Sequence, residues 1–326
     1  MVRYSNSIGQ EIYELRESGA IFSEIAEVFD IAISTAYNYY NMYVESAISS
    51  DEDNDGCTCN CNCNCKSHKS IDMSQFFDGD YDLLQGESLS IYPVSDWHIG
   101  SPNCKFELMD DWFNRFEDDN NPKIILGLGD YLEVASKSVG NSSFSQNYNV
   151  NEQMDILLRY LKPFKKNIAG MVSGNHGGRL VKDFDFDLDL EIARSLDTTC
   201  KSRDTKKFLI NGEEYSIYFT HGKGSVSKDE LALSKLIRDN NSSESNLILN
   251  GHTHRSCWGS RVIDMGNGVY NRRYYAYCGS MLDFENSYGD LGGFSPLLPS
   301  YIRVNVSNVN NNLVTSLDIF NSDEIL

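Results

Sequence analysis

From residue 86 to residue 326, short apolar runs alternate with longer segments in which apolar residues recur every three or four positions. Runs of the first kind, such as 123–128 and 168–172, are typical of buried β-strands. Segments of the second kind, such as 107–116 and 151–162, have the spacing of amphipathic helices. Further strands are expected at 88–94, 215–219, 247–249, 273–278 and 301–306, and further helices at 187–197 and 229–237. This succession predicts a layered α/β domain over residues 86–326.

Residues 8–43 also carry apolar positions at helical spacing, with Gly19 as a helix stop. We expect a small all-α unit over residues 1–45. The segment 12–40 resembles the helix-turn-helix of resolvase- and invertase-type DNA-binding domains, whose third helix enters the major groove. The last expected helix, residues 34–43, carries no Lys or Arg, and residues 1–43 have two arginines against six acidic residues. DNA contact through residues 8–43 and a protein-interaction or oligomerisation role are therefore both open.

Residues 46–85 break the composition of the chain. An acidic stretch, 51–56, is followed by five cysteines that alternate with Thr or Asn, namely Cys57, Cys59, Cys61, Cys63 and Cys65. Alternating thiols can wrap a soft metal such as Zn or Cu(I), although this spacing matches no paired Cys-x2-Cys module. The other interpretation is a low-complexity linker, which we favour. The four remaining cysteines are expected to be reduced thiols.

Apolar residues make up 40% of the 326 residues, which is enough for a sizeable core. No apolar run approaches the length of about 18 residues that crosses a bilayer, and the N-terminus lacks a signal-peptide pattern. We therefore expect no membrane contact and a cytoplasmic protein, in the host cytoplasm if the chain is of viral origin. The net charge of −19 argues against a broad basic surface for nucleic acid. It does not exclude a nucleic acid whose phosphate is held by metal ions.

Polar motifs follow five of the expected strands, and they contain five of the six histidines in the chain. In order, the motif residues are Asp96 and His98, Asp130, Asn175 and His176, His221, and His252 and His254. In an extended chain residues i and i+2 point the same way, so Asp96 and His98 are expected side by side. Carboxylate, imidazole and amide ligands together suit borderline divalent ions such as Mn, Fe, Zn or Ni. The pattern therefore predicts a metal site at the strand ends.

These motifs form an ordered set, which reads Asp96-Trp-His98, Gly129-Asp130-Tyr-Leu-Glu133, Gly174-Asn175-His176-Gly177, His221-Gly222 and Gly251-His252-Thr-His254. The set, over residues 86–310, resembles the calcineurin-like metallophosphoesterases. The resemblance implies a four-layer α/β/β/α sandwich and two divalent metal ions, with Mn expected first. It implies one ion held by Asp96, His98, Asp130 and His254. It implies a second ion held by Asp130, Asn175, His221 and His252, so that the Asp130 carboxylate bridges the two.

By the same resemblance, hydroxide held between the ions attacks phosphorus, and His176 protonates the leaving oxygen. Asp130 and His176 are therefore the expected catalytic residues. Gly177 stands where the family carries an acidic residue, which puts the acid strength of His176 in doubt but leaves the ligands complete. Arg179 and Arg255 are candidates for holding the phosphate, and the other interpretation is that both are simply solvated. Glu133 is expected to support the fold or a ligand.

The first motif, from Ser95 to Ser101, resembles those of nuclease-type members of the family. The longer segment 95–179 resembles bacteriophage metallophosphoesterases that are often labelled DNA exonucleases. The leading hypothesis is a dinuclear-metal phosphodiesterase that acts on DNA. A phosphomonoesterase for nucleotides or phosphoproteins is the alternative that better suits the acidic composition. A non-catalytic DNA- or protein-binding scaffold is a further alternative, which the complete ligand set opposes.

Overall fold

The computed structural model describes residues 3–17, 25, 28–29, 31, 39–40, 43, 77–135, 146–226, 229–266, 268–285, 290 and 296–322. The chain divides into two compact units, Met1–Ser70 and Ile71–Leu326, which we describe separately. Within the described ranges, no helix is both long enough and apolar enough to cross a membrane.

The N-terminal unit contains helix α1 (Arg3–Glu17), which begins before the apolar pattern predicted from residue 8. Ile12 of α1 is fully buried and packs with Ile25 and Tyr40 in a small apolar core. This contact agrees with the apolar positions expected for a helical unit.

Two predictions for the first part of the chain fall mainly on residues outside the described ranges. The expected third helix spans 34–43, of which the structure describes only three residues, and the cysteine run 57–65 is not described at all. The helix-turn-helix and the cysteine metal cluster therefore stay predictions.

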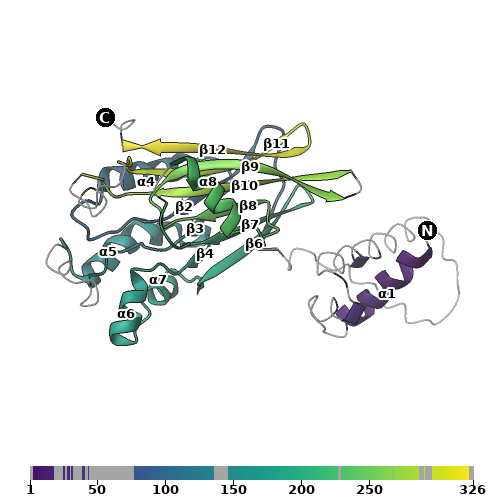
Figure 1. The fold of residues 1–326 in the computed structure, drawn as a ribbon, viewed down its shortest axis with the longest axis horizontal. Helices are drawn as coiled ribbons and strands as arrows, with labels where there is room; N and C mark the ends of the chain where they lie inside the picture. The colour runs from purple at the N-terminus through teal and green to yellow at the C-terminus, as the bar shows by residue number, and fades with distance from the viewer. Residues whose placement is uncertain are drawn as a thin grey trace, which may run out of the picture. The chain divides into compact units, whose positions relative to one another are not determined.

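The second unit is built around a curled sheet, shown in Figure 1. Its strands are β1 (Gly79–Tyr81), β2 (Ser88–Val94), β3 (Lys123–Gly127), β4 (Ile168–Val172), β5 (Cys200–Lys201), β6 (Arg203–Ile210), β7 (Glu213–Thr220), β8 (Leu247–Asn250), β9 (Ser256–Gly266), β10 (Val269–Ser280), β11 (Ser300–Val309) and β12 (Asn312–Asn321). The main path runs β1-β6-β7-β8-β10-β11-β2-β3-β4-β5, with β9 paired to β10 and β12 paired to β11.

Strand β10 joins the two halves of the sheet. In one half β2, β3, β4 and β5 run parallel, and in the other half β7, β8 and β10 run parallel. Residues 274–277 of β10 pair with β8, whereas Gly279 and Ser280 pair antiparallel with β11. The sheet therefore turns from one half to the other within this strand.

Helices cover the outer face of each half. The helices of the second unit are α4 (Phe106–Asp118), α5 (Val150–Leu161), α6 (Gly177–Phe184), α7 (Leu188–Ser195) and α8 (Asp229–Asp239), with a 3-10 turn η3 (Lys162–Asn167) after α5. Buried side chains of α4, α5 and α7 belong to one apolar cluster with β2 and β3. Ala232 and Leu236 of α8 pack on Ile248 and Tyr275 of the other half.

Alternation along the strands separates the layers. Leu89 and Ile91 of β2 face an inner core shared with β7 and β8, while Tyr92 and Val94 face the helices. Apolar side chains on both faces of a strand are typical of parallel strands that are covered on both sides. The layers run helix, sheet, sheet, helix, and the predicted α/β/β/α sandwich is confirmed.

Most elements expected from the pattern are present, although strands β5 and β6 were not expected, and three further differences follow. Helix α5 ends at Leu161, one residue earlier than expected. The chain then continues through Pro163 as the 3-10 turn η3, because a proline is tolerated in the first turn of a helix. Helix α6 was not expected, since the segment after His176 opens with two glycines. Strand β1 pairs with β6, so the sheet begins inside the segment predicted to be a linker.

Candidate metal centre

The predicted motif residues meet at the carboxyl ends of five strands. These strands are β2, β3 and β4 of one half of the sheet, and β7 and β8 of the other. Parallel strands end at the same edge of a sheet, so the segments that follow them lie close together. Three groups of side chains there have ligand atoms within 4.8 Å of one another, namely Asp96, His98 and His254; His98, Asp130 and His176; and Asp130, His221 and His252.

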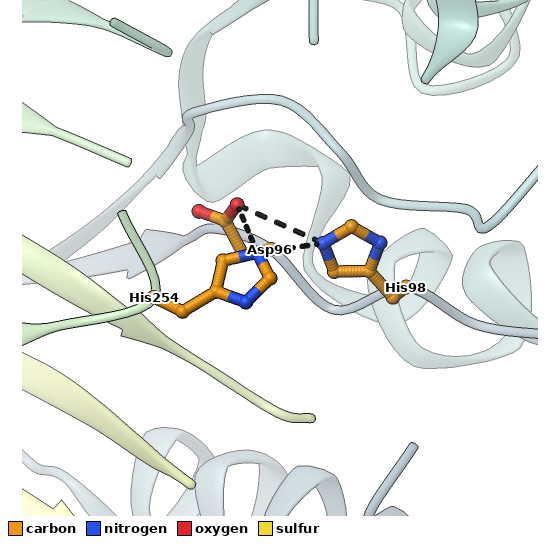
Figure 2. A group of neighbouring side chains, drawn as sticks. All are labelled: Asp96, His98 and His254. Carbon is orange, nitrogen blue, oxygen red and sulfur yellow. Dashed lines mark hydrogen bonds and ion pairs between the residues drawn. The ribbon is translucent and has the colours of Figure 1, made fainter. Parts of the chain in front are cut away.

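The first group is formed by Asp96, His98 and His254, which point toward one another in Figure 2. Oδ1 of Asp96 lies 3.3 Å from Nε2 of His254 and 3.8 Å from Nε2 of His98. The two imidazole Nε2 atoms are 3.1 Å apart. Three potential ligand atoms therefore surround one point.

The backbone that brings Asp96 and His98 together is not the extended chain that the sequence suggested. Strand β2 ends at Val94, and the φ angles of Asp96 and His98 are 52° and 48°. His254 has the same left-handed backbone, with φ of 55°. Non-glycine residues in this region carry strain that is typical of functional sites. The side chains do converge as predicted, but through left-handed backbone at Asp96 and His98 instead of strand alternation.

The carboxylate of Asp96 is completely buried, and its two oxygens have different surroundings. Oδ2 accepts hydrogen bonds from the Ser95 hydroxyl at 2.5 Å and from the His252 amide at 2.9 Å. Among the described residues, Oδ1 has no hydrogen-bond partner, and it faces the two imidazoles. A buried carboxylate oxygen without a donor is costly, and a cation at that point would satisfy it.

Glu133 fixes the orientation of His98. A carboxylate only accepts, so Nδ1 of His98 donates to Oε2 of Glu133 at 3.1 Å. Nε2 is therefore the nitrogen that faces Asp96 and His254, and it is the atom that would bind a metal after losing its proton. Burial alone would lower the pKa of His98, but the Asp96 and Glu133 carboxylates outweigh burial and raise the pKa to about 10. The surroundings thus favour positive charge at this position.

The third group is formed by Asp130, His221 and His252, and Asn175 lies next to it. Nε2 of His221 lies 3.1 Å from Oδ2 of Asp130, 2.9 Å from Oδ1 of Asn175 and 3.2 Å from Nδ1 of His252. The opposite nitrogen of His221, Nδ1, donates to the Leu128 carbonyl at 2.8 Å. Nε2 is thereby the nitrogen that faces Asp130, Asn175 and His252. Acceptors converge in this way when a cation lies between them.

Asp130 lies next to the imidazoles of two groups, His98 with His176 and His221 with His252. Its carboxylate is buried, Oδ1 accepts the His176 amide hydrogen at 2.8 Å, and Oδ2 faces His221. Burial alone would raise the pKa of Asp130, yet the imidazoles of His221, His176 and His98 hold the pKa below its usual range. An ionised carboxylate between two sets of imidazoles is suited to bridge two cations.

His176 is neutral in the described arrangement. Nδ1 donates to the Glu133 carbonyl at 2.6 Å, and Nε2 accepts from the Arg179 guanidinium at 2.6 Å, because an Arg nitrogen only donates. Burial, followed by the positive charge of His98, lowers the pKa of His176 to about 4. Nε2 therefore carries no proton here. The predicted role of His176 as the acid needs a proton that this arrangement does not supply.

The two candidate arginines lie in different places. Arg179 is on α6 at the site, where its guanidinium also donates to the carbonyls of Glu133 and Val134 at 2.9 and 3.1 Å. Arg255 is buried, donates to the Val226 carbonyl at 3.0 Å and lines a cavity of about 340 Å³ next to His254. Neither side chain is simply solvated, so that interpretation is wrong for both.

The structure brings all seven predicted ligand residues, His176 and Arg179 to one place, and it adds residues that the sequence did not indicate. Ser95 holds Asp96, and its position beside that residue was the only signal. Asp189 of α7 accepts the Gly174 amide hydrogen at 2.9 Å, a contact for which no local sequence signal exists.

A family model described as calcineurin-like phosphoesterase matches residues 89–275, which is more than half of the chain. No curated protein matches the chain.

Similar solved structures include three that each cover between 71% and 73% of the chain. Vacuolar Protein Sorting 29 from Cryptosporidium parvum is 14% identical over 73% of this chain and 100% of its own, with a TM-score of 0.36. A zinc complex of Vps29 from Entamoeba histolytica is 15% identical over 71% of this chain and 99% of its own, with a TM-score of 0.35. A metallophosphoesterase from Sphaerobacter thermophilus is 16% identical over 71% of this chain and 87% of its own, with a TM-score of 0.36.

Proposed function

We propose that this chain, which belongs to the calcineurin-like phosphoesterase family and is a metal-dependent phosphoester hydrolase, holds two divalent ions and cleaves phosphodiester bonds in DNA. The observation that carries the two-ion proposal is the place of Asp130 between two groups of imidazoles. Asp96, His98, Asp130 and His254 would hold one ion, and Asp130, Asn175, His221 and His252 would hold the other. When bound, such ions neutralise phosphate charge and lower the pKa of water.

Mixed imidazole, carboxylate and amide ligands suit Mn, Fe, Zn or Ni, and we propose Mn first because the family resemblance implies it. Four of the seven ligands are imidazoles and only two are carboxylates, which disfavours the oxygen-ligand ions Ca and Mg. Two observations support the binding of cations by these residues, namely the unpartnered Oδ1 of Asp96 and the acceptors that converge around His221.

Arg179 and His176 would act on the phosphate ester from the side of α6. Nη1 of Arg179 donates to two backbone carbonyls, and the remaining donors of the guanidinium suit phosphate oxygens. For His176 to protonate the leaving oxygen, its Nε2 must gain a proton and give up the hydrogen bond from Arg179. We propose that substrate binding draws Arg179 to the phosphate and frees His176 for this step. Arg255 beside His254 is a further candidate for contact with the substrate.

The proposal of a DNA substrate rests on the first motif, Ser95 to Ser101, and on the helical unit at the N-terminus. We propose three parts, namely a DNA-contacting unit over residues 1–45, a linker over 46–85 and the catalytic domain over 86–326. A tethered DNA-binding unit would raise the local concentration of DNA at the metal centre. The net charge of −19 restricts contact with DNA phosphates to the metal centre and to local groups.

The same negative charge favours one alternative, a phosphomonoesterase for nucleotides or phosphoproteins. Small monoesters need no extended basic surface, because both ions and one or two arginines suffice to hold a terminal phosphate. This alternative uses the same ligands and differs only in substrate.

The deciding experiment is degradation of end-labelled single- and double-stranded DNA with Mn²⁺, run beside an aryl phosphate monoester. Asp130→Ala serves as the control for contaminating nucleases, because the proposed bridge is lost. Mn²⁺-dependent DNA cleavage that disappears in Asp130→Ala is the expected result. Intact DNA together with rapid hydrolysis of the monoester would replace the nuclease proposal by the phosphomonoesterase.

A further inference from the structure

The carboxylate of Asp189 is buried beside the metal centre, yet none of the roles described above uses it. Asp189 lies in the first turn of α7 with only 4% of its surface exposed. Its Oδ2 accepts the amide hydrogen of Gly174 at 2.9 Å. A hydrogen bond from a backbone amide to a buried carboxylate is among the stronger hydrogen bonds in proteins. Asp189 therefore fixes the backbone directly before Asn175 and His176.

Gly177 is the residue that makes room for this carboxylate. A Cβ atom at position 177 would lie 2.4 Å from Oδ2 and 2.6 Å from Oδ1 of Asp189, closer than such contacts occur. No side chain fits at position 177 while Asp189 keeps its place. The same segment approaches Asp130 closely, since a Cβ at position 174 would lie 2.1 Å from the Asp130 amide nitrogen.

The segment 174–177 therefore carries Asn175 and His176 between two glycines, which are the residues with the greatest backbone freedom. Two hydrogen bonds restrict it, one from the Gly174 amide to Asp189 and one from the His176 amide to Asp130. Asn175 itself is exposed, so packing does not hold its side chain. Its Oδ1 nevertheless lies 2.9 Å from Nε2 of His221.

We propose that Asp189 is a positioning residue for the metal ligand Asn175, acting through the Gly174 amide, and that Gly177 is required because it leaves space for that carboxylate. The proposal rests on the ligand set of the proposed function. By this proposal Asp189 of α7 strengthens binding of the ion held with Asn175 and His221. It does not affect binding of the ion held with Asp96 and His254. Loss of an outer hydrogen-bond partner of a metal site typically weakens metal binding about 10- to 100-fold.

The test is calorimetric titration of the metal-free full-length protein with Mn²⁺ in three variants. Asp189→Leu keeps the approximate size but removes the acceptor, and Gly177→Ala leaves Asp189 in the chain but displaces its carboxylate. Both are expected to weaken one of the two Mn²⁺ sites about 10- to 100-fold and to leave the other within about 3-fold of wild type. Asp189→Asn retains an oxygen that accepts the Gly174 hydrogen and is expected to rescue most of the affinity.

Two further proteins identify the affected site and control for the helix. Asn175→Ala removes the ligand itself, so it must weaken the same Mn²⁺ site as Asp189→Leu. Glu191→Leu makes the same change of charge on α7, where Glu191 pairs with Arg194, and must bind Mn²⁺ like wild type. If Asp189→Leu does not fold, the Mn²⁺ affinities of Gly177→Ala and Asp189→Asn test the positioning role of Asp189.

Wild-type Mn²⁺ affinity at both sites in Asp189→Leu and Gly177→Ala would overturn the inference while the proposed function stands. Equal weakening of both sites would also overturn it, because Asp189 would then support the whole domain. A wild-type protein that binds fewer than two Mn²⁺ ions would instead refute the two-ion proposal, and this inference with it.

Discussion

Oδ2 of Asp130 lies 3.1 Å from Nε2 of His221, and this contact joins the two halves of the curled sheet. Asp130 follows β3 in one half, whereas His221 follows β7 in the other. Neither half alone contains a complete set of ligands, since His98 also depends on His254 from the second half. The centre therefore forms only when the halves pack together, and metal binding is coupled to folding of this unit.

Replacement of Asp130 by alanine tests its bridging position. The variant loses a ligand of both proposed sites. It also removes the negative charge that the imidazoles of His98 and His221 share. We expect kcat/KM for phosphoester hydrolysis to fall at least about 100-fold, and binding of both Mn²⁺ ions to weaken. Activity assays with Mn²⁺ and calorimetry measure both effects. Asp118→Ala, an exposed aspartate at the end of α4, is the matched control and should match wild type.

Replacement of Glu133 tests how far orientation of His98 matters. Glu133→Ala removes the acceptor of the His98 Nδ1 hydrogen, so the imidazole can rotate or change tautomer. We expect the Mn²⁺ site that contains His98 to weaken about 10- to 100-fold. Glu133→Gln keeps an amide oxygen as acceptor and should lose less. If both variants bound Mn²⁺ as tightly as wild type in calorimetry, the orienting role of Glu133 would be refuted.

The sequence was sufficient to predict which residues form the centre and which strands precede them, because each motif directly follows its strand in the chain. Asp96, Asp130 and His221 each follow an apolar run, and such runs determine both the strand and its carboxyl end. The conformation of the motifs was not predictable in the same way. Asp96 and His98 adopt positive φ angles because the loop is held by contacts with distant residues, such as the His252 amide on Asp96.

Contacts between helices and loops account for what the sequence did not reveal. Gly177 was identified only as a departure from the family pattern, and nothing near Asp189 indicates that its carboxylate packs there. That relationship depends on how α6 and α7 turn back toward β4, which tertiary packing decides. No helix was expected around Arg179, but α6 places it against His176. Single-residue roles at such contacts follow from the structure alone.

Removal of metal should lower the stability of the second unit. Ions that bind only the folded chain stabilise it by mass action, by about 2.7 kcal/mol when free metal is 100 times its Kd. We expect chelation to lower the Tm by several degrees and added Mn²⁺ to restore it. Thermal unfolding followed by circular dichroism measures the change. In Asp130→Ala the difference between chelator and Mn²⁺ should largely disappear, and an equally large difference there would contradict the proposed ligands.

The stability of the metal-free protein should depend on pH through Asp189. Burial raises the pKa of the Asp189 carboxyl from its ordinary value of 3.8 to about 7, so the folded chain holds a proton that the unfolded chain has lost above about pH 4. The free energy of unfolding should therefore fall as pH rises from about 4 to 7, by as much as about 4 kcal/mol from this group. Asp189→Asn cannot titrate at this position and should lack this part of the pH dependence.

Denaturant unfolding of both proteins with chelator present, at intervals between pH 4 and pH 8, measures the difference. The histidines of the centre also change protonation on unfolding, because the folded chain raises the pKa of His98 to about 10 and that of His221 to about 9. They are present in both proteins, so the difference between the two curves isolates position 189. We expect the variant to gain stability relative to wild type as pH rises through the window, with the gain levelling off above about pH 7. Parallel curves would show that the carboxyl at position 189 is ionised throughout and that the Gly174 amide offsets its burial.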